Sequence, residues 1–502
     1  EHPTVAGLAR HLKRASRTTD GEGTAPEPFA LVSAADQALL PEGLEDAWPL
    51  SRLQSGMLYH SMLHPETPVY HDIFSYDVEA PFDEGLLSRA VRETASAHPQ
   101  LRSSFDLASF NEPLQLVHRT ASPEVEVLDM AGLSAHDQRV AIAEWTEREK
   151  SSSFDMESAP LVRVCVHRRS ADAFTLTLAF HHAVLDGWSV ALVVEETRRR
   201  YAALLAGGQL EAGGEQLPYS AFVALEREAL ADPEQAAFWS TLLEGAEPTL
   251  LSAGNPASET AAGATSSERE LPADAVEILQ DMARELGVPP RTVFTGLHAH
   301  ALGRITGRSE VLTGLVVNGR PELDGEELAG LFLNTVPVRA AVSAVQWTEV
   351  FAGIFRSEQA LMAHRRFPLG EILRSHGSGE VFDTVFNYTD FHVYGNVEEA
   401  GSDDAVRISG ARYFEMTSFP FMVHVHRDHF AGRTSLIVNH NPSAVSEGVV
   451  TAYMNAYSEA LTAAVGRRPP TIGMPAGEAP DVSAESESER RIAEAVAVAL
   501  GG

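Results

Sequence analysis

The sequence predicts an α/β protein that is built from two similar layered lobes. Segments with the spacing of strands and helices alternate along both halves of the chain, an order typical of layered α/β folds. A glycine-rich stretch at residues 207–216 (GGQLEAGGEQ) interrupts the pattern and separates the two halves. The chain has 502 residues, of which 44% are hydrophobic and 22% charged, values that are ordinary for a globular protein of more than one domain.

The elements of the first half follow a segment at residues 18–27 that is rich in Gly, Thr, Glu and Pro, as linkers are. Apolar residues three and four positions apart indicate helices, and short alternating runs such as FTLTLAF at 174–180 indicate strands. The expected helices cover residues 53–64, 84–97, 135–150 and 188–205. The expected strands cover residues 73–78, 113–118, 124–128, 161–167 and 174–181.

The second half repeats this alternation over a longer stretch. The expected helices cover residues 219–230, 233–244, 273–286, 291–304, 348–363 and 445–464. The expected strands cover residues 311–317, 335–339, 383–389, 411–416, 420–427 and 433–440. These patterns place the lobes at residues 46–210 and 211–467 and linkers at 15–45 and 468–485. Amphipathic helices are expected outside the lobes, within residues 1–14 and 486–502.

Composition and charge argue against several classes of function. A net charge of −32 is unsuited to binding the phosphates of a nucleic acid. No apolar run is long enough to span a membrane, and no signal peptide is recognisable, so neither a nucleic acid nor a membrane is expected as a partner. Cys165 is the single cysteine, which excludes a disulfide framework and favours a cytoplasmic location.

Residues 181–187 (HHAVLDG) place several proton-handling groups on a turn between an expected strand and an expected helix. Neighbouring strand residues point to opposite sides, so only one of His181 and His182 can face a given cleft. Asp186 is either the N-cap of the helix or one partner of a buried ion pair, and Gly187 permits a tight turn. The helix N-terminus behind Gly187 is expected to offer free N–H groups to a developing negative charge. No metal site is expected, because neighbouring histidines diverge and no third ligand is evident.

The motif and several others resemble those of one protein family. HHAVLDGWS resembles the HHxxxDG signature of nonribosomal peptide synthetase condensation domains, a branch of the chloramphenicol acetyltransferase-like superfamily. PLSRLQSGML at 49–58 is similar to the opening motif of the family, and GLFLNTVPVR at 330–339 matches its GxFxNTxPxR pattern. AHPQLRSSF at 97–105 resembles RHxxLRTxF, although alanine replaces the first arginine. FDTVFNY at 382–388 resembles a segment that lines the tunnel of the family, and the resemblance spans about 46–467.

The resemblance implies a fold and a reaction. The two lobes are expected to form a V-shaped pseudo-dimer around a central tunnel. The implied reaction is amide formation between a peptidyl or aminoacyl thioester and the amine of a second aminoacyl thioester. Both substrates are carried on the 4′-phosphopantetheine arms of partner carrier domains, and the domain itself is expected to bind no cofactor. Because a thioester is already activated, alignment of the two groups is expected to contribute most of the rate.

The resemblance also assigns roles to particular residues. His182 is expected to be catalytic, either as general base for the amine or as a group that aims it. For two of the other positions, Arg320 and Trp188, a second role is also considered. Structural roles are expected for His181, Asp186 and Gly187, and also for Arg320, which is either the ion partner of Asp186 or an arginine on a solvent-facing turn. Substrate contacts are expected for Trp188, which is otherwise a core aromatic, and for Asn387.

The two ends of the chain refine this expectation. EHPTVAGLARHL resembles the last helix of a peptidyl carrier domain, and SESERRIAEAVAVALG resembles the first helix of another, although an ordinary linker helix is the alternative for the latter. The expected partners are therefore an upstream and a downstream carrier domain, with an adenylation domain elsewhere. Two rival functions remain open: a free acyltransferase that uses coenzyme A thioesters, and a non-catalytic docking module. An epimerisation domain is disfavoured because Trp188 precedes Ser189.

Overall fold

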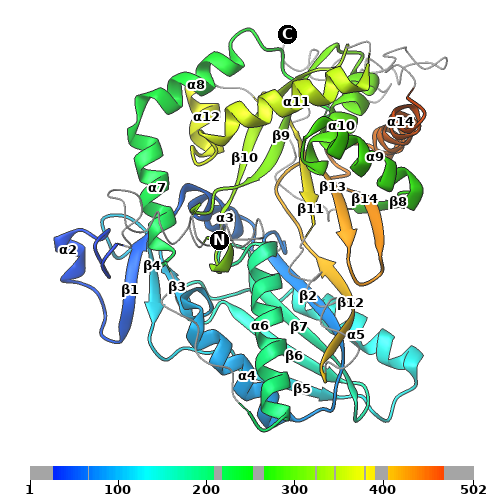
Figure 1. The fold of residues 1–502 in the computed structure, drawn as a ribbon. Coiled ribbons are helices and arrows are strands. Elements are labelled where there is room, and N and C mark those ends of the chain that lie inside the picture. The colour runs from blue at the N-terminus through cyan, green and yellow to red at the C-terminus, as the bar shows by residue number, and fades with distance from the viewer. Residues whose placement is uncertain are drawn as a thin grey trace, which may run out of the picture.

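The computed structural model describes residues 26–65, 67–208, 217–252, 265–322, 325–343, 346–377, 380–390 and 405–467. Two lobes lie one above the other, each built on a β-sheet with helices packed against it (Figure 1). The α/β architecture and the division into two lobes agree with the prediction from sequence. The carrier-like segments expected at 1–14 and 486–502 and the linker expected at 468–485 lie outside the described residues.

The sheet of the first lobe has five strands in the order β12-β2-β7-β6-β5. Its strands are β2 (His71–Glu79), β5 (Val125–Asp129), β6 (Val162–Arg168), β7 (Ala173–His181) and β12 (Arg407–Phe414). Its helices are α4 (Glu84–Ala97), α5 (Ala135–Lys150) and α6 (Gly187–Leu205). Alternate residues of each strand separate the two faces. Phe74 and Phe180 pack toward α4 and α6, whereas Ile73 and Ala179 lie with Trp145 of α5.

The sheet of the second lobe has six strands in the order β10-β9-β11-β13-β14-β8. Its strands are β8 (Thr265–Glu270), β9 (Glu310–Asn318), β10 (Leu333–Ala341), β11 (Thr384–Thr389), β13 (Phe421–Asp428) and β14 (Arg433–His440). Its helices are α7 (Ser220–Ala231), α8 (Pro233–Leu243), α9 (Ala273–Leu286), α10 (Pro290–Thr306), α11 (Trp347–Met362), α12 (Leu369–His376) and α14 (Glu447–Val465). A short 3₁₀ turn, η2 (Gly325–Glu327), precedes β10.

Strand β12 corrects the predicted division of the chain into contiguous lobes. Residues 407–414 fall inside the predicted second lobe, but they pair antiparallel with β2 in the sheet of the first lobe. Figure 1 shows this strand running beside β2, below the sheet of its sequence neighbours. Pairing between distant strands is decided by tertiary contacts, which local patterns do not encode. The crossing strand ties the two lobes together beside the turn that carries His182.

A small sheet of β1 (Leu44–Pro49), β4 (Leu114–His118) and β3 (Ser103–Asp106) adjoins the first lobe. A 3₁₀ turn, η1 (Pro99–Arg102), precedes β3, and the helices α2 (Ala34–Gln37) and α3 (Arg52–Leu63) flank β1 in the sequence. Residues 26–45, which were predicted to be linker, are folded here. Val32 is buried in one cluster with Leu44 and Leu114, so apolar packing extends beyond the predicted boundary.

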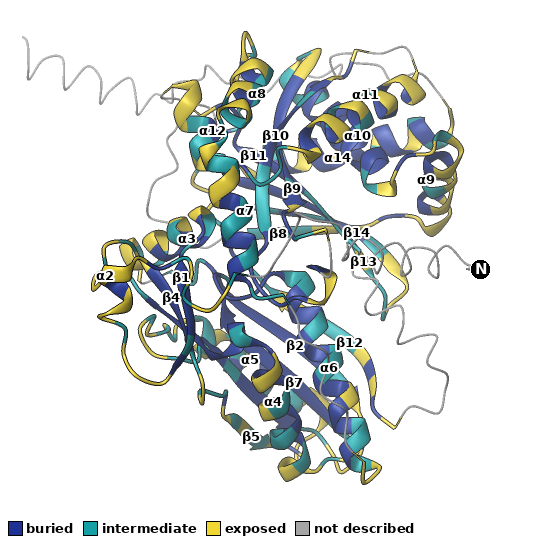
Figure 2. Cartoon of the chain, turned by 60° about the vertical axis from the view of Figure 1, so that its left-hand side comes forward, coloured by how far each residue is buried: buried dark blue, intermediate teal, exposed yellow. Residues whose placement is uncertain are grey.

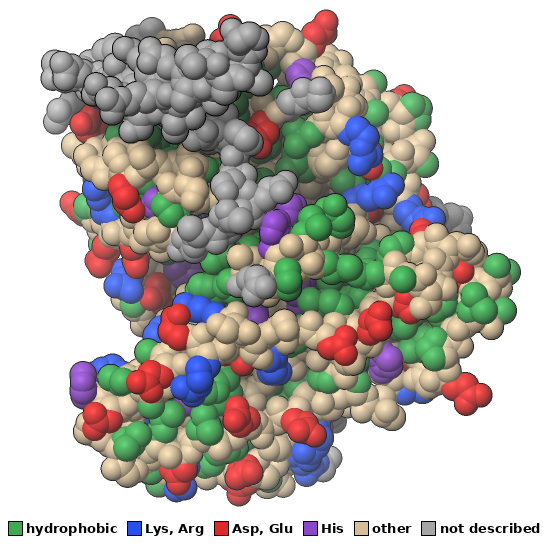
Figure 3. All heavy atoms as spheres, turned by 180° about the vertical axis from the view of Figure 1, so that it is seen from behind, with side chains coloured by type: hydrophobic (Ala, Val, Ile, Leu, Met, Phe, Trp, Pro, Cys, Tyr) green, Lys and Arg blue, Asp and Glu red, His purple; other side chains and the backbone are tan. Residues whose placement is uncertain are grey.

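Buried side chains concentrate on the inner surfaces of both lobes (Figure 2). The larger cluster fills the second lobe around α10, α14 and the central strands, and a second cluster lies between the first sheet and α4 and α6. On the face shown in Figure 3, acidic and basic side chains are interspersed among the described residues. Within the described ranges, no helix has both the length and the apolarity that crossing a lipid bilayer requires.

We expect the fold to lose stability as the pH falls below about 6.5. Burial lowers the pKa of five histidines to about 3 or 4, namely His167, His181, His298, His300 and His424. These side chains stay neutral in the folded state, whereas the unfolded chain binds protons below its ordinary histidine pKa of about 6.5. Each therefore removes about 1.4 kcal/mol of stability per pH unit between that value and its lowered pKa.

Two buried carboxyls act in the opposite direction over the same range. Burial raises the pKa of Glu226 and Glu415 to about 7, so both bind protons in the fold before the unfolded chain does. The five histidines outnumber them, and the net effect is destabilisation. Thermal unfolding followed by circular dichroism should show a clearly lower transition temperature at pH 5 than at pH 6.5; above pH 6.5 the raised pKa of His182 increases stability as the pH falls, so that range is excluded from the comparison. Equal transition temperatures at the two pH values would contradict this expectation.

Candidate active site

The HHAVLDG turn connects the end of β7 to the start of α6 and faces the second lobe. His181 lies on the α5 side of the sheet, where it is opposite His71 in the strand register. Its Nε2 is 3.0 Å from Ser61 Oγ, and its Nδ1 accepts the backbone N–H of Ala183 at 3.2 Å. Burial, with the neighbouring histidines, lowers its pKa to about 3. His181 is therefore a neutral ring whose two nitrogens both hold the turn in shape.

His182 points the other way and contacts an acid that sequence reasoning did not single out. Its Nδ1 lies 2.6 Å from Oδ2 of Asp72, which is on β2, and its side chain is 12% exposed. Burial lowers the pKa of His182, but the Asp72 carboxylate, assisted by Glu415 and Asp186, more than offsets this and raises it to about 9. His182 thus keeps one ring nitrogen on a carboxylate and the other free of that contact.

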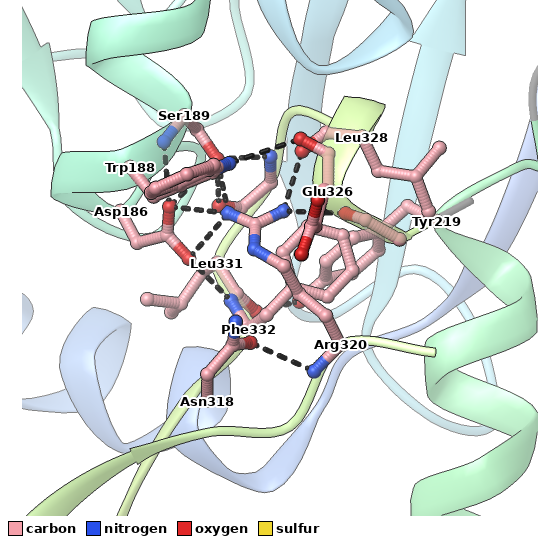
Figure 4. Close-up of polar contacts among 12 residues, drawn as sticks. Asp186, Trp188, Ser189, Tyr219, Asn318, Arg320, Glu326, Leu328, Leu331 and Phe332 are labelled. Carbon is pink, nitrogen blue, oxygen red and sulfur yellow. Dashed lines mark hydrogen bonds and ion pairs between the residues drawn. The ribbon is translucent and has the colours of Figure 1, made fainter. Parts of the chain in front are cut away.

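Asp186 combines the two roles that the sequence left open. Its Oδ1 accepts the backbone N–H of Ser189 at 2.8 Å and thereby caps α6. The same carboxylate pairs with Arg320, whose Nη2 donates to Oδ1 at 2.6 Å and to Oδ2 at 2.9 Å. Figure 4 shows both contacts converging on the carboxylate, which is fully enclosed. The helix N-terminus, which was expected to offer free N–H groups to an oxyanion, therefore has its Ser189 N–H already occupied by Asp186.

Arg320 follows β9 and brings the second lobe to this turn. Its guanidinium lies 4.1 Å from the centroid of the Phe332 ring, and its Nη1 donates to the carbonyl oxygens of Gly325 and Leu328. The side chain is 4% exposed, so the alternative of a solvent-facing arginine is wrong. This buried ion pair, in which one arginine nitrogen donates to both carboxylate oxygens, joins the two lobes and fixes the turn in one position.

The GLFLNT segment completes the joint from the second lobe. The Gly330 carbonyl accepts the N–H of Asp186 at 2.9 Å, and its N–H donates to Ser189 Oγ at 2.9 Å. A Cβ on Gly330 would come within 2.6 Å of the Tyr219 ring, so this position has no room for a side chain. The N–H of Phe332 donates to Oδ2 of Asp186 at 3.2 Å. This motif of the sequence therefore serves to seat the Asp186 turn.

Three other residues were predicted to belong to the site, and the structure places each of them in a different position or contact. Gly187 is the first residue of α6, directly behind the cap. Trp188 is half-buried, and its Nε1–H donates to the carbonyl oxygen of Glu326 at 3.0 Å, so it links α6 to the second lobe. Asn387 is half-buried on β11, beside His424 of β13. Its contact with substrate stays a prediction. Among the described residues, no cluster of His, Cys, Asp and Glu side chains is arranged to hold a metal ion.

Two further residues missed by sequence reasoning frame His182. Tyr70 has a left-handed backbone with φ of 64°, and its carbonyl oxygen accepts the N–H of His182 at 2.8 Å.

The second of these residues, Glu415, follows the last residue of β12. Because Phe414 pairs with Ile73 across the strands, Glu415 comes level with Asp72. An acid in the buried part of β2 was the available signal for Asp72, since unpaired acids are rarely buried. For Glu415 no local signal exists.

Comparison with known proteins decides the family. The family model described as "Condensation domain" matches residues 44–467. The chain belongs to the condensation domain family. Its curated relatives include the AMB antimetabolite synthetase AmbE of Pseudomonas aeruginosa, 38% identical over 399 residues, which are 78% of this chain. A linear gramicidin synthase polypeptide of Brevibacillus parabrevis is 30% identical over 449 residues, which are 84% of this chain.

Solved condensation domains have the same fold. The first condensation domain of the CDA synthetase superposes with a TM-score of 0.71 at 20% identity, covering 85% of this chain and 98% of that structure. The condensation domain of the monacolin K polyketide synthase MokA gives a TM-score of 0.71 at 18% identity, covering 86% of this chain and all of that one. The expected acetyltransferase-like fold is thereby confirmed. The chain spans 19% and 6% of the two curated relatives, so it corresponds to one part of such synthetases.

Proposed function

We propose that this condensation domain joins a donor acyl group to an acceptor amine. The donor is a peptidyl or aminoacyl thioester on an upstream carrier domain. The acceptor is an aminoacyl thioester on a downstream carrier domain. The observation that carries the proposal is His182, a partly exposed imidazole that the Asp186–Arg320 pair and Asp72 hold at the junction of the two lobes.

The chemistry requires one proton transfer and one bond exchange. The acceptor nitrogen attacks the thioester carbonyl carbon, a C–N bond forms and the C–S bond breaks. In its neutral form, which becomes more populated as the pH approaches its raised pKa of about 9, the His182 ring takes at Nε2 the proton that the nitrogen loses, and the departing thiolate then receives that proton as a thiol. The donor arm ends as a free thiol, and the acceptor arm carries the lengthened chain. Alignment of the two arms supplies most of the acceleration, because the thioester is already activated.

The proposed partners follow from the form of these substrates. Each phosphopantetheine arm belongs to a carrier domain, so the domain holds no cofactor of its own. An adenylation domain elsewhere would load the acceptor amino acid. The curated relatives named above support this arrangement, because both are several times longer than the matched segment. The carrier-like sequences at the two ends of this chain are the places where such partners would adjoin.

A donor comparison tests the proposal. One acceptor carrier, loaded with an aminoacyl group, is mixed with the domain and with the same acyl group on either a donor carrier or free coenzyme A. We expect transfer from the carrier to exceed transfer from coenzyme A by at least about tenfold, measured as the mass of the acceptor arm. A coenzyme A donor is the second candidate, because a starter condensation domain of rhizomide synthetase with TM-score 0.69 is described in complex with C8-CoA. Equal rates from both donors would favour that candidate. No transfer from either donor would contradict the proposal and favour a non-catalytic docking module.

A further inference from the structure

Asp72 contacts the His182 ring through its carboxylate and is almost completely enclosed. The Asp72 side chain is 3% exposed, and its Oδ2 is 2.6 Å from His182 Nδ1. At this separation the carboxylate and the protonated ring form an ion pair, although the two atoms do not meet the angular geometry of a hydrogen bond. A buried acid without a partner would be strongly destabilising, so this contact accounts for its presence in the strand.

The backbone around Asp72 holds the contact from two sides. In the antiparallel pairing of β2 with β7, Asp72 lies opposite Phe180, which places its side chain on the same face as His182 two residues further on. Tyr70 then reverses the chain in a left-handed conformation, accepts the His182 N–H through its carbonyl, and donates its own N–H to the Met416 carbonyl at 3.0 Å. One short segment, residues 70–72, therefore binds both the backbone and the ring of His182.

We propose that Asp72 is the positioning residue of His182: its carboxylate pairs with the Nδ1 side of the ring and so turns Nε2, which accepts a proton when the ring is neutral, toward the acceptor amine. This inference rests on the proposed function. Without the carboxylate, the neutral ring is free to carry its proton on either nitrogen, and the Nε2–H form cannot accept a proton from the substrate. With it, the imidazolium is stabilised by an adjacent negative charge, so the neutral ring that accepts a proton becomes populated as the pH approaches 9. Asp72 itself exchanges no proton with substrate.

Other titratable groups lie near His182, but each contributes less negative charge to the ring than Asp72 does. Asp186 is paired with Arg320, which neutralises it. His181 is neutral and lies on the opposite face. Glu415 shares the face of Asp72, but burial and the charge of Asp72 raise its pKa to about 7, so at neutral pH it is partly protonated. Asp72 is thus the dominant source of negative charge at the ring, in agreement with the raised pKa of His182.

The test compares Asp72→Asn with two matched variants. Asparagine keeps the size of the side chain and removes its charge. Glu79→Gln makes the same kind of change at the exposed end of β2 and serves as the control, and Glu415→Gln removes the second acid on the same face. Circular dichroism and the thermal transition establish that each variant folds. Asp72→Glu restores the charge one methylene further out and is expected to recover part of the activity.

Two readouts separate positioning from a purely structural role. The first is the titration of His182 in the unloaded domain, followed by NMR of ring-labelled histidine and assigned by the signal that His182→Ala loses. We expect the His182 pKa to lie near 9 in the parent protein and in Glu79→Gln. In Asp72→Asn we expect it to fall by two units or more, and in Glu415→Gln by less than one. The second is single-turnover transfer at pH 9, where a large share of the ring is neutral in the parent as well as in the variant; there Asp72→Asn should lose about 10²–10⁴-fold in rate at unchanged carrier affinity.

The outcomes also distinguish this inference from the proposed function. If His182→Ala abolishes transfer while folded Asp72→Asn titrates and transfers like the parent, within threefold, the positioning role of Asp72 is wrong and the proposed function stands. If His182→Ala transfers normally, the catalytic assignment itself fails. If Asp72→Asn does not fold, Asp72→Ser takes its place, and a folded Asp72→Ser with the His182 titration and transfer rate of the parent would overturn the inference.

Discussion

The His182→Ala variant of this domain should transfer donor chains to the acceptor about 10²–10⁴-fold more slowly than the parent protein. The variant removes the only imidazole that the turn directs away from the α5 side of the sheet, and with it the group that accepts the amine proton. An α-amino group has a pKa of about 8, so much of the acceptor is protonated at neutral pH and needs a base. The measurement is single-turnover transfer between two loaded carriers, quenched and read by mass spectrometry.

The control for this variant is His136→Ala. His136 is exposed on α5, on the opposite side of the sheet from the His182 ring, and its loss should leave the rate unchanged. Raising the pH from 7 to 9 should increase the deficit of His182→Ala, because the amine deprotonates in both proteins but only the parent also gains the neutral, proton-accepting form of His182. A His182→Ala rate within threefold of the parent at pH 7 would exclude both the general-base role and the positioning role of this histidine.

Arg320→Met should cost about 3–5 kcal/mol of stability, because it leaves the Asp186 carboxylate buried without its partner. Asp186→Asn should cost a similar amount, since it leaves the Arg320 guanidinium charged and enclosed. The double variant should be less destabilised than the sum of the single variants, because no unpaired charge remains. Chemical denaturation of all three proteins measures these differences. Both single variants should also transfer more slowly, because the same pair seats the turn that carries His182.

An exposed ion pair provides the comparison for this prediction. Arg284 and Asp281 face solvent one turn apart on α9, and Arg284→Ala should cost at most about 1 kcal/mol. If Arg320→Met proved as mild as Arg284→Ala, the Asp186–Arg320 pair would not be what holds the turn. Activity provides a second check, since Arg284→Ala lies far from the site and should transfer at the parent rate.

The helices were the part of the fold that local sequence patterns predicted best. The spans predicted at 84–97, 135–150 and 273–286 coincide with α4, α5 and α9. Several shorter elements were missed, among them β3, β8 and α12. The β8 strand, TSSERE, carries no apolar residues, and its side chains alternate between half-buried and exposed positions at the sheet edge. Its pairing with β14 comes from backbone hydrogen bonds, which leave no signature in the sequence.

The residues of the candidate site also fall into two groups: those that local motifs predicted and those that only the paired strands bring together. The motif-bearing residues were found because they are close in sequence, and the pairing of Arg320 with Asp186 followed from the family resemblance. Asp72 and Glu415 were not found, because their relation to His182 exists only once β2, β7 and β12 have paired. Local patterns describe one strand at a time, whereas the chemistry of His182 depends on three. The candidate catalytic histidine could therefore be identified from sequence, whereas the residues that surround it could be identified only from the structure.

The fate of the two carrier arms in a single turnover tests the proposed function most directly. A donor carrier with a labelled aminoacyl thioester and an acceptor carrier with a second aminoacyl thioester are mixed with the intact chain, and both arms are weighed after quenching. We predict that the acceptor arm gains the mass of the donor acyl group through an amide while the donor arm returns to a free thiol. Loss of the donor group to water, with the acceptor arm unchanged, would contradict amide formation by this domain.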